Sequence, residues 1–147
     1  MAIDTLFKLV IRWIGIRADR DERRIAASIE FRNTFIEELQ GLYPEPVNWP
    51  KAYGIDPVLK AKFAMLRSAV EKYEPFVADS KRAAFKKAWR EYSCGIDHDN
   101  TVQDYSHYMH FTTVDHNATG GLNEMRRNGK AAFQQNVDKL LSFATDI

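Results

Sequence analysis

The sequence predicts an all-α fold: an antiparallel bundle of about four main helices, with a short amphipathic helix added at the N-terminus. Apolar residues recur at helical spacing in five separate segments, and no segment alternates apolar and polar residues long enough to indicate a sheet. The chain has 147 residues, of which 45% are hydrophobic and 12% aromatic, so it can bury one ordinary core. We therefore expect a single helical domain over residues 1–147.

The first helix is expected over residues 2–15, within an amphipathic N-terminal segment of residues 1–16. Gly15 predicts a break after it, because glycine weakens a helix interior. Charged residues interrupt the segment every fourth position, whereas a membrane span needs about twenty apolar residues in a row. Its apolar residues share one broad face: Ile3, Leu6, Phe7, Val10, Trp13 and Ile14.

The second helix is expected from about residue 19 to residue 42, where Pro44 and Pro46 end it. A proline-rich loop over residues 43–56 follows. Asp56 and Pro57 then form a typical helix start, with a capping side chain before a proline at the first helical position. The third helix has the most regular apolar seam in the chain: Leu59, Phe63, Leu66, Val70 and Tyr73.

The fourth helix begins near Asp79 or Ser80, after Pro75 has ended the third. Residues 95–120 form an irregular segment rich in His and Asp, and a closing helix is expected over residues 121–144. Gly129 is a weak point in that helix, worth about 1 kcal/mol against Ala. One core should hold the central apolar residues: Phe63, Leu66, Val70, Phe85, Trp89, Val137 and Leu140.

Three short segments follow one another in a definite order: Phe31-Arg32-Asn33, Ala88-Trp89-Arg90-Glu91-Tyr92 and Leu140-Leu141-Ser142-Phe143-Ala144. In this order they resemble segments of a loose group of uncharacterised bacterial helical proteins, over about residues 23–144. The resemblance implies a helical fold, and the group has no assigned activity that could be carried over. Some members begin with a membrane-spanning helix followed by basic residues; this chain lacks the uncharged span but keeps Arg17, Arg20, Arg23 and Arg24.

All four histidines fall within nineteen residues, beside Cys94 and four aspartates. His107 and His110 would share one face of a helix, and imidazole with carboxylate suits Zn²⁺ or another first-row ion. The alternative is a polar surface loop, because the paired cysteines or HExxH segment of a strong zinc motif are missing from the sequence. We expect no cofactor; the alternative is a divalent metal held by His98, His107, His110 and His116.

The balance of charge gives little indication of a polyanionic partner. Formal net charge is +1, and the basic residues over 81–90 and 126–130 suit a solvated helix face, so we do not expect nucleic-acid binding. Cys94 is the single cysteine, which excludes an internal disulfide and fits a reducing compartment. The expected location is the cytoplasm.

No catalytic constellation is visible, so the sequence does not reveal an activity. We expect a non-enzymatic helical interaction or accessory protein that binds a protein partner or itself. The alternative is a metal-dependent activity or metal sensor built on residues 97–116. The N-terminal helix and the arginines up to residue 24 could also lie on an anionic membrane. Because Asp19, Asp21 and Glu22 alternate with those arginines, docking on protein, including the bundle itself, is the favoured expectation.

Overall fold

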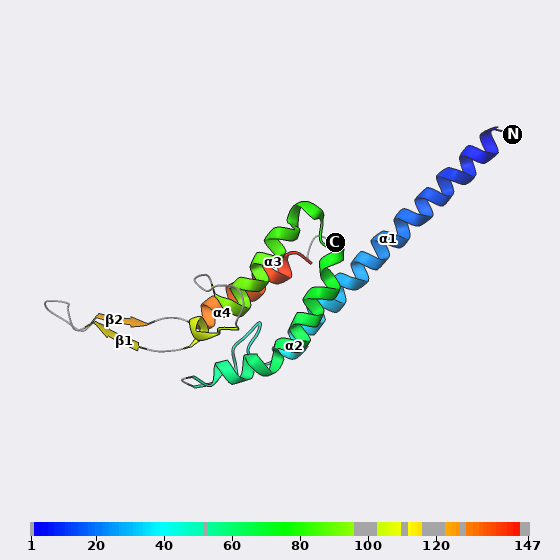
Figure 1. The fold of residues 1–147 in the computed structure, drawn as a ribbon. Coiled ribbons are helices and arrows are strands. Elements are labelled where there is room, and N and C mark those ends of the chain that lie inside the picture. Colours follow the sequence, from blue (N-terminus) through cyan, green and yellow to red (C-terminus); the bar gives the residue numbers. More distant parts are fainter. Residues whose placement is uncertain are drawn as a thin grey trace.

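The computed structural model describes residues 2–51, 53–95, 103–109, 112–115, 123–126 and 129–144. It confirms the predicted helical bundle (Figure 1). The four helices are α1 (Ala2–Glu38), α2 (Ile55–Tyr73), α3 (Asp79–Cys94) and α4 (Gly129–Ser142). A short 3₁₀ turn, η1 (Glu74–Phe76), follows α2, and a second, η2 (Ser106–Tyr108), lies between α3 and α4.

A small hairpin was not predicted. Strand β1 (Thr112–Asp115) pairs antiparallel with β2 (Asn123–Arg126), and the pair extends away from the bundle in Figure 1. Consequently α4 begins at Gly129 and not near residue 121. Each strand has only four residues, which is too short for alternation to be recognised in a sequence.

The helices pack antiparallel to their neighbours. At one end of the α1–α2 contact, the hydroxyls of Ser28 and Tyr73 lie 3.1 Å apart; toward the other end, Lys62 Nζ lies 3.5 Å from Glu38. In the α3–α4 contact, the rings of Phe85 and Phe143 are 5.4 Å apart, and those of Tyr92 and Phe133 6.0 Å apart. Later residues of one helix therefore meet earlier residues of the next in both pairs.

The core is aromatic and draws on all four helices. Five of the seven residues predicted for it are buried: Leu66, Val70, Phe85, Val137 and Leu140. The other two, Phe63 and Trp89, are half-buried, and their rings stack at 5.6 Å along the edge between α2 and α3. A set of residues chosen by helical spacing includes such edge positions, because periodicity shows on which side of the helix a residue lies and not how deeply its side chain is buried.

Helix α1 runs without interruption through Gly15, so the predicted break is wrong and the predicted N-terminal helix is the first half of α1. A lone glycine costs a helix only about 1 kcal/mol, too little to end one by itself. At 1.5 Å per residue, α1 is about 55 Å long. Its second half packs on α2, whereas the blue half in Figure 1 projects beyond the bundle.

The projecting part, residues 3–24, is called the arm below. Every residue of the arm is exposed, and the first fully buried residue of α1 is Ser28. The arm therefore does not dock on its own bundle, which corrects one of the docking modes expected from the sequence. Within the described residues, no helix is both long enough and apolar enough to cross a membrane.

Candidate docking surface

Nine large apolar side chains of the arm face solvent. Their exposed fractions run from 47% at Val10 to 83% at Ile3. Contiguous exposed apolar surface on a folded protein marks an interaction site. Sequence analysis identified six of these residues; the structure adds Leu9 and Ile11, which a single narrow stripe leaves out, and Ile16, which lies beyond the predicted break.

The apolar surface of the arm is wide. At about 100° per residue, the nine apolar residues span an arc of about 220° around the helix. The remaining narrow strip holds Asp4, Thr5, Lys8 and Arg12, together with Gly15. An ordinary core-facing helix needs an apolar stripe of little more than about 100°. A single partner helix would cover only part of the apolar arc.

Charge is sorted around the arm. On the same helical geometry, five arginines (Arg12, Arg17, Arg20, Arg23 and Arg24) fall within an arc of about 140°. The four carboxylates of the arm (Asp4, Asp19, Asp21 and Glu22) fall on the other side. The helix therefore separates the arginines from the carboxylates, although Lys8 lies among the carboxylates and Asp21 lies within the apolar arc. Basic and apolar arcs overlap, because Arg17, Arg20 and Arg24 continue the apolar face toward the bundle.

The arginines of the arm are available to an external anion. The guanidinium of Arg17 lies 5.1 Å from the ring centre of Trp13, a cation–π contact that leaves its charge in place. Among the described residues, the ion pairs join side chains of the bundle, from Glu30 onward. The basic side of the arm thus lacks the internal neutralisation found in the bundle.

Only one of the four predicted metal ligands can be placed. His107 lies in η2, half-buried, with its ring centre 3.7 Å from that of Tyr108. His98, His110 and His116 lie outside the described residues. Across the ranges that the structure does describe, no three His, Cys, Asp or Glu side chains gather closely enough to hold a metal. The metal site accordingly remains a prediction.

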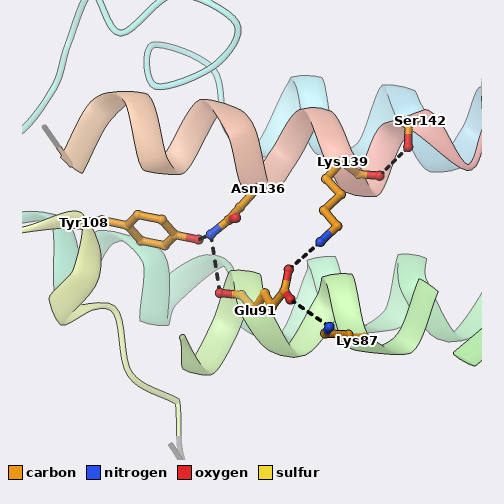
Figure 2. A network of polar contacts seen from close by, with 6 residues as sticks. All are labelled: Lys87, Glu91, Tyr108, Asn136, Lys139 and Ser142. Carbon is orange, nitrogen blue, oxygen red and sulfur yellow. Dashed lines mark hydrogen bonds and ion pairs between the residues drawn. The ribbon is translucent and has the colours of Figure 1, made fainter. Parts of the chain in front are cut away.

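A polar network ties the segment around His107 to the bundle (Figure 2). The Tyr108 hydroxyl donates to the Tyr92 carbonyl at 2.8 Å, and Asn136 Nδ2 donates to that hydroxyl at 2.8 Å. On the same side of α3, the Glu91 carboxylate pairs with Lys139 at 2.7 Å and with Lys87 at 3.8 Å. Burial raises the pKa of Tyr108 well above its usual value, so its hydroxyl stays protonated and holds α3, α4 and η2 together.

A groove with polar walls lies between α2 and α3. It has a volume of about 810 Å³, and the stacked rings of Phe63 and Trp89 line it. Three of its four cations have partners: Lys60 pairs with Asp56 at 2.9 Å, Arg67 with Glu71 at 3.0 Å and Lys86 with Glu74 at 3.0 Å; the fourth is Arg90. This neutralisation makes the groove a weaker candidate for an anionic ligand than the arm.

The lone cysteine lies near this groove but is buried, with Sγ 3.5 Å from the Ser93 hydroxyl. A reactive cysteine is partly exposed and lies close to a positive charge or a helix N-terminus. Cys94 is instead the last residue of α3, at the negative end of the helix dipole. Its surroundings suit a small packing residue.

Comparison of the chain with protein-family models, curated proteins and solved structures gives no significant match. The class that the fold and the surface define is a helical bundle that carries an exposed amphipathic arm.

Proposed function

We propose that this protein is a non-enzymatic interaction protein, in which the four-helix bundle presents the arm to a binding partner in the cytoplasm. One observation carries the proposal: nine large apolar side chains of residues 3–16 are exposed, although the bundle has a complete core without them. The exposed arm and the buried core are separate parts of the chain, since the first buried residue of α1 lies beyond the arm.

The energetics favour docking of such an arm. Burying one large apolar side chain contributes about 1.5–3 kcal/mol, so burying all nine would contribute more than about 10 kcal/mol before the costs of association are subtracted. The arm also lacks tertiary support, and an isolated helix of this length is marginal in water. A partner would therefore supply both an apolar environment and the stabilisation that the helix does not receive from the bundle.

The proposal predicts that the arm can be removed without harm to the bundle. A chain that begins at residue 25 keeps every buried core residue, so its melting temperature should match that of the full chain within about 2 °C. The full chain should bind lipid vesicles or associate with itself, whereas the truncated chain should do neither. Thermal unfolding by circular dichroism and sedimentation velocity, with and without vesicles, measure these properties.

Two results would contradict the proposal. A fall of more than about 5 °C on truncation would show that the arm supports the fold. A full chain that stays monomeric and free of vesicles over the tested concentrations would show that the exposed apolar face is not a docking surface.

A further inference from the structure

We propose that the arm docks on an anionic lipid surface, lying at the interface with its apolar arc in the outer acyl region. This inference rests on the proposed function, because it names the partner of the same surface. It is carried by the width of the apolar arc, by the sorting of charge around the arm and by the placement of Trp13 beside Arg17.

The width of the apolar arc suits a lipid interface. A lipid surface adapts to the helix and can cover all nine apolar residues, including those at the edges of the arc. The polar strip with Asp4, Lys8 and Arg12 would then face the headgroups and water, as in interfacial amphipathic helices. Crossing the membrane is not required, in keeping with the absence of a span among the described residues.

The charge arrangement suits an anionic surface. Arg17, Arg20 and Arg24 lie on the continuation of the apolar face, where the arm leaves the apolar region and approaches the bundle. Their side chains are long enough to keep the guanidinium groups at lipid phosphates while the stems cover apolar surface. Asp19 and Glu22 are turned away from that face by the same helix, whereas Asp21 lies on it, one turn from Arg17 and from Arg24.

Trp13 lies near the end of the apolar segment, one turn before Arg17. Its indole is 60% exposed and contacts the Arg17 guanidinium, so an aromatic ring near the end of the apolar segment meets the first arginine beyond it. Tryptophan and arginine are both favoured at the level of lipid headgroups. Along α1, the apolar segment with Trp13 near its end is thus followed by the arginines Arg17, Arg20 and Arg24.

A second copy of the chain fits this surface less well. One seam that would pair two parallel arms is Ile3, Leu6, Val10 and Trp13, and it continues in Arg17, Arg20 and Arg24 at the same 3–4 spacing. Parallel pairing would set these arginines against their copies, and like charges at such positions repel. Antiparallel pairing avoids that repulsion but covers only one side of the wide arc.

The test is co-sedimentation of the full chain with vesicles of phosphatidylcholine alone or mixed with phosphatidylglycerol. We expect binding to the mixed vesicles, weakened by high salt, and little binding to phosphatidylcholine alone. The triple variant Arg17→Glu/Arg20→Glu/Arg24→Glu should weaken binding by about a hundredfold or more. The double variant Leu6→Glu/Val10→Glu should abolish it, because it places charge in the apolar arc.

A matched control changes the same charge elsewhere. The variant Lys60→Glu/Arg67→Glu/Arg90→Glu alters three exposed cations of the bundle and should bind mixed vesicles within about threefold of the native chain. Equal loss in both triple variants would show a net-charge effect and overturn the proposed role of the arm. Equal binding to both kinds of vesicle, unaffected by the arginine changes, would overturn the anionic requirement.

The remaining outcomes separate this inference from the proposed function. Self-association through the arm, without vesicle binding, would overturn the lipid partner and leave the arm as a docking element. A chain that neither binds vesicles nor associates would overturn both.

Discussion

Replacing Phe85 by alanine is expected to lower the free energy of unfolding by about 3–5 kcal/mol, the usual cost of truncating a buried aromatic side chain. Phe85 is fully buried, and its ring lies 5.8 Å from Phe31, 5.8 Å from Tyr73 and 5.4 Å from Phe143. It therefore joins α1, α2 and the end of α4 to α3. Equilibrium unfolding in urea, followed by circular dichroism, measures the change.

Phe76→Ala is the matched control. Phe76 also stacks on Tyr73, at 6.5 Å, but is 37% exposed at the end of η1. Its truncation should cost no more than about 1.5 kcal/mol, because less apolar surface is uncovered. Equal costs at the two positions would place the core somewhere other than around Phe85.

Replacing Gly129 by alanine is expected to destabilise the protein by about 2 kcal/mol or more, although alanine is the better helix former. Gly129 is the first residue of α4 and is buried. A Cβ atom added there would lie 2.6 Å from the Tyr108 carbonyl carbon and 3.0 Å from its Cα. Backbone atoms cannot move aside cheaply, so the segment of residues 103–109 must shift. The melting temperature should fall by several degrees.

The same substitution at Gly15 is the control and should act in the opposite direction. A Cβ atom there has no neighbour within 4 Å among the described residues, and Gly15 lies inside a continuous helix. Gly15→Ala should strengthen the arm helix by about 0.5–1 kcal/mol and raise the helical signal without lowering the melting temperature. A fall in melting temperature for Gly15→Ala, or a rise for Gly129→Ala, would contradict these placements.

The two glycines show where sequence reasoning reached its limit. Residue type and propensity correctly describe the cost of glycine in a helix, but the outcome depends on surroundings that only the fold supplies. Gly15 was expected to break a helix and lies within one. Gly129 was expected to weaken the closing helix and instead permits close approach of Tyr108.

The bundle itself was largely predictable. The seam from Leu59 to Tyr73 predicts the end of α2 at Tyr73, but α2 begins at Ile55 with Gly54 at the N-cap, two residues before the start expected from Asp56 and Pro57. The hairpin was not predictable, because its pairing of Thr112 with Arg126 joins residues far apart in sequence. Periodicity also could not show that the arm is exposed: a buried face and an unpartnered one have the same pattern.

The candidate site was predicted in part. The amphipathic N-terminal segment and its four arginines were recognised as the most promising partner surface. Docking on its own bundle, one of the expected modes, is wrong, whereas docking on another protein and the metal site of the histidine segment remain predictions. The segregation of the arginines from Asp19, Asp21 and Glu22 appears only when residues 2–24 form one continuous helix, whereas a helix that ends at Gly15 separates the two sets.

The most direct test of the account is the environment of Trp13 in the variant Trp49→Phe/Trp89→Phe, which leaves it as the single tryptophan. In dilute solution its fluorescence should be that of a solvent-exposed indole, readily quenched by acrylamide. Vesicles containing phosphatidylglycerol should shift the emission to shorter wavelength and protect it from quenching. An indole already protected without vesicles, or one that stays exposed with them, would contradict a free arm that docks on anionic lipid.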